Sequence, residues 1–520
     1  MKKLNLSVGW RFPIFIIVTL FLLFFNQFLL NVPFNFHSSA FLTELLIFLL
    51  ALFACIKGRP EEDFDIKVIK NLYAPIIVIV LYILATLIGS PYTGGLHNYK
   101  NQADVDEVEF SSIPAFDKTQ VQLIDKNTAR QLGDRVFGTL GSEEVCQYNL
   151  GDEWTQIAID GVLKRVTPIE FDSFMKYLLT RTTPGYVIVD CQSGEADLVR
   201  SEGMKYLKSS FLMKDINRHL FFINPTAIYG PIKFELDDTG KPFWIAPVYQ
   251  VTWVSKTRDV KGVYVVDPVS GDAKYYDKKD APAWIDNIYP VEVIYDHFNQ
   301  SKRYENGLFN FANKGVVEFT DDYAYVRFDD DVSIYTGVTS VGKDESNVGF
   351  AYVNLRTGKI SYIREAGAEE YSARSSAEGA LQQYRYSAIF PSMVNAAGRP
   401  TYFMGMVDSA NLIKAYAFVS YENYQYVATG TTVEEAYRNY LALFNEDIYA
   451  GGQKEEKTFT VAQVQNIVRD GNTLIVILDT DNNLCWYDIS DGDLAASFIK
   501  EGETLTAIID DAGKISEFIR

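Results

Sequence analysis

The sequence has little histidine and little cysteine, with four of each in 520 residues. So few histidines argue against histidine-rich metal chemistry. The cysteines show neither metal-ligand spacing nor the pattern of a disulfide framework; they are Cys55, Cys146, Cys191 and Cys485. Cys146 and Cys191 could form one disulfide, and the alternative is two buried thiols.

Positive charge is also scarce. Lys and Arg number 48 against 67 Asp and Glu, which gives a net charge of −19. Because binding to nucleic acid needs clustered cations, this balance argues against a nucleic-acid partner. What the chain does have is apolar and aromatic: 48% of its residues are hydrophobic and 14% are Phe, Trp or Tyr. We therefore expect folded domains, roughly three or four of ordinary size.

Three apolar runs occupy the first 91 residues, at 12–30, 40–56 and 72–88. Each is about as long as a helix that crosses a bilayer, so the sequence predicts three transmembrane helices and the lipid bilayer as a partner. A cleaved signal peptide is the alternative for the first run. No small-residue cleavage pattern follows that run, which favours an uncleaved helix.

The flanks of these runs predict an orientation in the cell membrane. Lys and Arg precede the first run and lie between the second and the third, whereas residues 31–39 contain neither. The positive-inside rule then places the N-terminus in the cytoplasm and everything after about residue 90 outside it. The first 91 residues carry a net charge of +2 and the remainder −21. The predicted extracytoplasmic portion is therefore large and acidic.

Three segments of that portion share one pattern: GYVIVDCQSGEADLV from Gly185, GVYVVDPVSGDAKYY from Gly262 and GFAYVNLRTGKISYI from Gly349. In each, Asp or Asn follows a strand-like run, and a glycine follows four residues later. Such a side chain can accept hydrogen bonds from backbone amides just ahead, and the glycine tolerates a positive φ. The pattern predicts three hairpin turns, at Asp190 and Gly194, Asp267 and Gly271, and Asn354 and Gly358. Calcium binding by these side chains is the alternative, but turn chemistry already accounts for them.

This unit, combined with an adjacent amphipathic helix, resembles the PepSY domain family of exported bacterial proteins. The resemblance rests on the same three pairs of turn residues and covers about 15 residues in each place. It implies small α+β modules outside the membrane that associate with other proteins and often restrain peptidases. The chain departs from the family because no peptidase domain accompanies the modules and the segments between them are longer.

Two helices and a C-terminal unit complete the predicted elements. Helices are expected at 377–387 and at 432–444, the second with Thr432 as N-cap and Glu435 three residues later. A polar linker at 451–457 is followed by five short strand-like runs between 459 and 519, which suit a small OB-like or SH3-like barrel.

Several motifs with chemical meaning are incomplete. GVTSVGK at 337–343 has the spacing of a phosphate-binding loop, but Asp344 replaces the Ser or Thr that would hold magnesium. Three Ser-x-x-Lys patterns lack the companion motifs of penicillin-recognising enzymes; they begin at Ser173, Ser340 and Ser497. The sequence 479–490 starts like a calcium loop and lacks its Gly and final Glu.

His219 and His297 could act as acid or base, although a lone histidine is more often structural. Acidic clusters at 237–238, 321–322 and 329–331 could supply two carboxylates for glycoside hydrolysis.

The predicted fold class is therefore a membrane-anchored α+β protein: three N-terminal transmembrane helices, repeated PepSY-like modules of antiparallel sheet plus helix, and a small C-terminal β-barrel. The predicted domains are 1–91, 92–255, 256–363, 364–450 and 451–520. The predicted function is that of a multi-pass bacterial membrane protein whose extracytoplasmic portion is a non-enzymatic module that binds envelope proteins or peptides. No cofactor and no catalytic residue are predicted. The alternative is an envelope hydrolase that uses carboxylates of the exported domains.

Overall fold

The computed structural model describes residues 8–57, 66–88, 91–93, 95–252, 257–328, 330–342, 346–444, 455–469, 472–480, 484–488, 496, 499–509 and 515–519. The chain divides into two compact units, residues 1–433 and 434–520. Sheet dominates both units, in five separate sheets of five to seven strands.

The N-terminal segment forms three helices: α1 (Val8–Leu29), α2 (Ser39–Lys57) and α3 (Ile66–Leu87). In the part of the chain that the structure describes, no helix is both long enough and apolar enough to span a membrane. The predicted membrane-anchored α+β fold class is therefore wrong, and the prediction of a multi-pass membrane protein is not supported. An apolar run indicates where a helix forms, whereas a membrane crossing also requires a sufficiently long apolar stretch within that helix.

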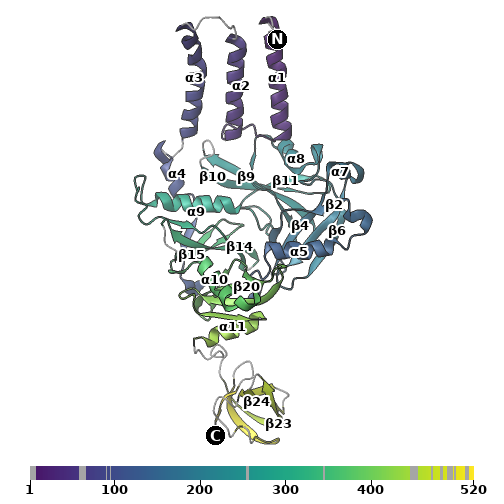
Figure 1. Ribbon diagram of the computed structural model, residues 1–520, viewed down its shortest axis with the longest axis vertical. Helices are drawn as coiled ribbons and strands as arrows, with labels where there is room; N and C mark the ends of the chain where they lie inside the picture. Colours follow the sequence, from purple (N-terminus) through teal and green to yellow (C-terminus); the bar gives the residue numbers. More distant parts are fainter. Residues whose placement is uncertain are drawn as a thin grey trace. The chain divides into compact units, whose positions relative to one another are not determined.

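Four copies of one supersecondary unit make up most of residues 126–430 (Figure 1). Each copy begins with a helix and continues with two short strands, two long strands and a last strand. In the sheet of each copy, both short strands pair with the first long strand. The first long strand pairs with the second, and the second pairs with the last strand; all these pairings are antiparallel. We call the copies repeats 1 to 4. The shared topology indicates duplication of a single unit.

The bounds of the repeats are as follows. Repeat 1 contains α5 (Lys126–Phe137), β2 (Tyr148–Leu150), β3 (Thr155–Ile159), β4 (Val162–Phe171), β5 (Thr183–Asp190) and β6 (Ala196–Met204), with the short helices α6 (Ser142–Val145) and α7 (Phe174–Thr180) inserted. Repeat 2 contains α8 (Ile216–Ile223), β7 (Ile228–Tyr229), β8 (Lys233–Leu236), β9 (Pro242–Thr252), β10 (Thr257–Val266) and β11 (Ala273–Asp277). Repeat 3 contains α9 (Val291–Glu305), β12 (Val317–Phe319), β13 (Ala324–Phe328), β14 (Asp331–Ser340), β15 (Ser346–Asn354) and β16 (Ile360–Ile363), with β17 (Gly367–Ala368) on β15. Repeat 4 contains α10 (Glu370–Ala380), β18 (Ser387–Ala388), β19 (Ser392–Ala396), β20 (Arg399–Val407), β21 (Ile413–Ser420) and β22 (Val427–Gly430).

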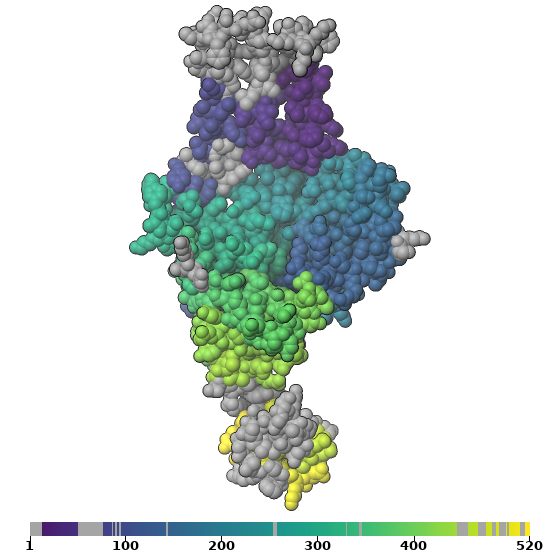
Figure 2. Space-filling model, in the orientation of Figure 1, coloured from purple at the N-terminus to yellow at the C-terminus, as the bar shows by residue number. Residues whose placement is uncertain are grey.

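The first helices of repeats 1, 3 and 4 pack on the sheet that follows each of them in the chain. Helix α5 lies against β5 and β6, α9 against β12, and α10 against β20, β21 and β22. The hydrophobic cores are also shared: one cluster joins the sheets of repeats 1 and 2, and a second joins those of repeats 2 and 3. Figure 2 shows the resulting continuous surface, on which the colour passes from blue through teal to green. The predicted boundary between 255 and 256 instead falls between β9 and β10, within one sheet.

The predicted turns connect the second long strand of a repeat to its last strand. Asp190 Oδ1 accepts hydrogen bonds from the amides two and three residues ahead, at 2.7 and 2.9 Å. Asp267 and Asn354 make the same pair of bonds. The glycines that follow have positive φ, at Gly194 (76°), Gly271 (85°) and Gly358 (74°). The oxygens on which a calcium site would depend are therefore engaged by backbone amides.

Repeat 4 has no such sequence pattern. At the equivalent place Ser420 begins the turn, and its Oγ accepts a hydrogen bond from the amide of Asn423. The turn closes with a bond from the Ser420 amide to the carbonyl of Tyr426, and no glycine lies between these residues. The longer turn explains why only three copies were predicted.

A segment that precedes the repeats, residues 95–121, runs across repeats 3 and 4. After α4 (Leu96–Lys100), strand β1 (Val105–Glu107) pairs in parallel with β16. Farther along, Phe116 packs between Phe403 and Phe418 of repeat 4. The short 3-10 helices are η1 (Pro91–Thr93), η2 (Phe110–Ser112), η3 (Lys118–Gln120), η4 (Leu212–Lys214) and η5 (Gln382–Tyr384).

Of the two helices predicted in the C-terminal half, one is confirmed: α11 (Val433–Ala442) lies within the predicted 432–444. The prediction of a helix at 377–387 is wrong beyond residue 380, because α10 ends there and η5 and the first residue of β18 follow. In residues 434–520, strands β23 (Glu455–Arg469), β24 (Asn472–Asp479), β25 (Leu484–Asp488), β26 (Thr504–Ile509) and β27 (Ile515–Ile519) form one antiparallel sheet in the order β25-β24-β23-β26-β27. Residues 451–454 of the predicted linker lie outside the described residues.

Candidate functional site

A polar cleft lies where repeats 2 and 3 meet the segment before β1. It consists of two adjoining cavities of about 500 and 350 Å³, which share Gln102, Asp259 and His297. Its walls come from α4 and the residues after it, from β10, from the connection that follows β11, from α9, and from the Asn354 turn of repeat 3. Cavities of this size hold small molecules or a few residues of a peptide.

Lys278, Asp259 and Tyr289 form a hydrogen-bonded group in this cleft. The Lys278 Nζ lies 2.7 Å from Asp259 Oδ2 and 2.8 Å from the Tyr289 hydroxyl. Burial acts to lower the pKa of Lys278, but the hydrogen bonds to Asp259 and Tyr289 outweigh it and raise that pKa. Burial raises the pKa of Tyr289. At neutral pH the lysine is therefore a cation and the tyrosine a neutral hydroxyl.

His297 lies on α9 and is only 7% exposed. Its Nε2 bonds to the carbonyl of Arg258. Since a carbonyl can only accept, Nε2 carries the hydrogen and Nδ1 is left as an acceptor. Burial lowers the pKa of His297, so the ring is neutral at neutral pH.

The cleft gathers charged side chains of both signs. Four cationic side chains and two carboxylates line it: Arg258, Lys278, Lys279 and Arg356, with Asp104 and Asp259. Three of the cations are neutralised by ion pairs, because Arg356 pairs with Asp331 at 2.6 Å, Arg258 with Asp296 at 2.5 Å and Lys278 with Asp259 at 2.7 Å. Lys279 is exposed and makes no ion pair among the described residues. It is the cation that the cleft offers to a ligand.

Amide side chains complete the lining of the smaller cavity. Asn98, Asn101 and Gln250 line it together with Gln102, and His97 lies beside them. The Gln102 amide donates to Gln300 Oε1 at 2.8 Å, which fixes its orientation. Amides can both donate and accept, so this half of the cleft suits a ligand with peptide or hydroxyl groups.

The structure places most of the predicted site residues outside this cleft. Gly358 lines it, whereas the residues of the turns at Asp190 and Asp267 do not, and Asp267 also pairs with Lys241 at 2.8 Å. The His219 ring binds the carbonyl of Gly271 at 2.7 Å, so it supports a turn. Within the described ranges, no group of three or more His, Cys, Asp or Glu could hold a metal ion.

The described acids of the three clusters lie between strands of the repeats or, for Asp331, at the start of β14, and Asp329 lies outside the described residues. Asp237 accepts bonds from the amides of its own turn, and Asp331 pairs with an arginine. Asp321 and Asp322 line a shallow cavity of about 350 Å³ with other acids, among them Glu370. The Glu370 carboxylate is buried and already accepts bonds from Tyr335 and Asn347. The structure therefore gives Asp237, Asp331 and Glu370 structural roles.

The other candidate motifs do not form a site. Gly337 lies inside β14 and Ser173 precedes α7, while Lys343, Ser497 and residues 481–483 and 489–490 lie outside the described residues. Cys146, which is exposed, and Cys191, which is buried, are not joined by a disulfide.

A buried carboxyl pair lies at the junction of repeats 1, 2 and 3. Glu235 accepts hydrogen bonds from the amides of Asp286 and Asn287 at 2.9 and 3.1 Å. Asp286 accepts one from the amide of Ala158 at 2.7 Å. Burial raises the pKa of Glu235 to about 7 and also raises the pKa of Asp286. Both side chains are at most 1% exposed, so this pair holds the repeats together and cannot meet a substrate.

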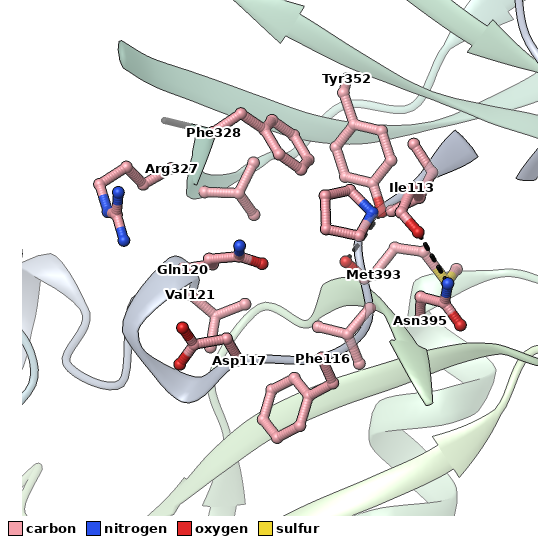
Figure 3. Close-up of a pocket in the computed structure, with 13 residues that line it drawn as sticks. Ile113, Phe116, Asp117, Gln120, Val121, Arg327, Phe328, Tyr352, Met393 and Asn395 are labelled. Carbon is pink, nitrogen blue, oxygen red and sulfur yellow. Dashed lines mark hydrogen bonds between the residues drawn. The ribbon is translucent and has the colours of Figure 1, made fainter. Parts of the chain in front are cut away.

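A third cavity, where the segment 113–121 crosses repeats 3 and 4, is too small for a ligand at about 20 Å³. Figure 3 shows Phe116, Phe328 and Tyr352 around it. Two hydrogen bonds bridge its walls, from the Tyr352 hydroxyl to the carbonyl of Met393 and from the Asn395 amide to the carbonyl of Ile113.

Sequence reasoning found only His297 and Gly358 among the residues of the cleft. The others come from separate segments of the chain, and no spacing within the sequence joins them. The adjacent lysines Lys278 and Lys279, next to a predicted strand, were the signal in the sequence that could have indicated the cleft. An adjacent pair of lysines is too common, however, to identify a site.

Comparison with known proteins does not identify the chain. No family model and no curated protein matches it. Among solved structures, a levansucrase mutant from B. megaterium aligns over 78% of this chain and 97% of its own, with 8% identity and a TM-score of 0.16. A TM-score this low carries no argument about fold or activity.

Proposed function

We propose that this chain is a non-enzymatic binding module, and that the cleft between repeats 2 and 3 takes a polar ligand with an anionic group. The observation that carries the proposal is the exposed Lys279 ammonium beside Lys278, at the mouth of a cavity of about 500 Å³. The other three cations of the cleft are paired with acids, so Lys279 supplies the positive charge that attracts an anionic group.

The protonation states favour recognition over catalysis. The raised pKa of Lys278 keeps its ammonium charged, so the amine is not available as a nucleophile or a base. The raised pKa of Tyr289 keeps its hydroxyl a neutral donor. His297 has one nitrogen committed to the backbone. These groups supply a fixed set of donors and one acceptor, as a binding site requires.

The ligand class that fits is a carboxylate attached to an amide, as in a protein or peptide partner. Lysine binds carboxylates by charge-assisted hydrogen bonds, and the amides of Asn98, Asn101 and Gln102 lie where a peptide group could pair with them. The acids near 321–322 do not support hydrolysis in the same way, because Glu370 is engaged by internal bonds.

N-acetylalanine tests the proposal, because it carries one carboxylate and one amide. We expect saturable binding to the full chain in about the millimolar range by calorimetric titration, and about tenfold weaker binding of its neutral methyl ester. Lys279→Gln should weaken binding several-fold. The matched control is Lys126→Gln, which removes an exposed lysine at the start of α5 that does not line the cleft. Equal binding of acid and ester contradicts the proposal.

A further inference from the structure

One strand edge of the repeats already holds an added strand. Strand β1 lies along the outer edge of β16 in parallel, with Val105 opposite Ile360 and Glu107 opposite Tyr362. Two ion pairs join this added strand to repeat 3, from Lys359 to Asp106 at 2.7 Å and from Arg364 to Glu107 at 2.6 Å. The last strand of a repeat can therefore accept an extended segment from elsewhere.

Strand β11 holds the same place in repeat 2 as β16 does in repeat 3. It is the terminal strand of its sheet and pairs only with β10, among the strands described. Its five residues are half-buried or exposed. An open edge of this kind presents backbone N–H and C=O groups to any extended chain that reaches it.

The register identifies which groups of β11 point outward. The amide of Lys278 bonds back to the carbonyl of Lys261 on β10, and the carbonyl of Asp272 accepts from the amide of Asp267. Because successive residues of an antiparallel pair alternate, the backbone groups of Ala273, Tyr275 and Asp277 face away from β10. These residues offer the free edge.

The direction of pairing leads to the cleft. If an incoming peptide runs parallel to β11, as β1 runs parallel to β16, its C-terminal end lies at the C-terminal end of β11. The next residues of the chain are Lys278 and Lys279, which line the cleft. Strands β6 and β22 occupy equivalent positions in repeats 1 and 4, but neither leads to the cavity that Lys279 lines.

We propose that β11 binds the C-terminal segment of an extended peptide by parallel strand addition, with the terminal carboxylate held at Lys279. This inference rests on the proposed function and names its ligand. Backbone pairing supplies affinity that does not depend on sequence, and the cleft selects a free C-terminus. On one face, the rings of Tyr275, Tyr264 and Tyr229 lie in a row, with centroids 5.2 and 6.0 Å apart. That row favours an aromatic or β-branched side chain in the peptide.

The probe is a fluorescently labelled hexapeptide of alternating valine and threonine with a free carboxylate, measured against the full chain by fluorescence polarisation. We expect the C-terminal amide of the same peptide to bind about tenfold more weakly, since it lacks the charged partner of Lys279. Lys279→Gln should reduce binding of the acid to the level of the amide, and Lys126→Gln should not.

The backbone contribution is tested at Tyr275. Tyr275→Pro removes an outward N–H without breaking a bond to β10, and Tyr275→Thr removes the ring but keeps that N–H. We expect the proline variant to bind at least about tenfold more weakly than the threonine variant. Thermal unfolding of both variants checks the fold, and Ala273→Pro with Ala273→Ser is the second pair if Tyr275→Pro does not fold.

The outcomes separate the two proposals. If N-acetylalanine binds but the peptide binds no better, or proline and threonine variants bind the peptide equally, strand addition is overturned and the cleft remains a binding site. If neither probe binds, both proposals are overturned. Equal binding of the peptide acid and amide overturns the placement of the carboxylate at Lys279.

Discussion

The three equivalent turn glycines allow one prediction to be worked out within a single molecule. Gly194, Gly271 and Gly358 have φ between 74° and 85°, a region that costs an alanine about 1–2 kcal/mol. The same substitution therefore carries the same backbone cost at all three positions. Any difference between the variants must come from what the new methyl group meets.

The surroundings of the added Cβ differ sharply. At Gly194 it would meet a methyl of Ile124 at 3.3 Å, which small shifts can relieve. At Gly358 it would lie 2.9 Å from the Tyr289 ring. At Gly271 it would overlap the ring of Tyr206, which is 8% exposed and packs on His219 with ring centroids 4.4 Å apart.

Overpacking of a buried ring adds about 1–3 kcal/mol to the backbone cost. We therefore expect Gly194→Ala to lower the free energy of unfolding by about 1–2 kcal/mol and Gly271→Ala by about 2–5 kcal/mol, with Gly358→Ala between them. Urea unfolding of the full chain, followed by tryptophan fluorescence, measures the shift in midpoint at unchanged slope. Equal destabilisation by all three variants would refute the steric part of the reasoning, and no destabilisation by Gly194→Ala would refute the backbone part.

Three further predictions concern buried polar groups. The raised pKa values of Glu235 and Asp286 mean that these carboxyls bind protons more tightly in the folded chain than in the unfolded chain. Their contribution to the free energy of unfolding is therefore greatest below about pH 4 and is lost as the pH rises through about 7. Asp286→Asn should flatten the fall in urea midpoint between about pH 5 and pH 8, and an unchanged slope would contradict this. Glu153 bridges two partly exposed lysines, so Glu153→Ala should lower the free energy of unfolding by about 1 kcal/mol, and by less in high salt. Urea unfolding at two salt concentrations measures this difference. Tyr352→Phe leaves the Met393 carbonyl unpaired between repeats 3 and 4 and should lower the free energy of unfolding by about 1–2 kcal/mol; an unchanged urea midpoint would argue that the bond is not needed.

Sequence reasoning succeeded where the chemistry is local. An Asp or Asn followed by Gly four residues later contains all the groups that its turn uses, so the turns at Asp190, Asp267 and Asn354 could be located from the sequence. The equivalent turn at Ser420 uses a different side chain and one more residue, and the pattern does not reveal it. The repeat topology is thus better conserved within the chain than the motif that first indicated it.

The failures have a different physical origin. The apolar runs near the N-terminus predicted helices from hydrophobicity alone, but the further step to membrane crossing is not supported. The boundary at 255–256 was placed without knowing that β9 and β10 are neighbours in one sheet. The cleft depends on five separate segments brought together by the packing of repeats 2 and 3, which local patterns cannot describe.

The pairing of β1 with β16 has a consequence for the order of folding during synthesis. The partner of Val105 is Ile360, which the ribosome adds 255 residues later. At 5–20 residues per second, β1 leaves the ribosome roughly 13–50 s before its partner strand exists. Repeats 1 and 2 can form in that interval, while β1 has no partner strand. The two acids in β1, Asp106 and Glu107, keep that strand soluble during the delay and then become the partners of Lys359 and Arg364.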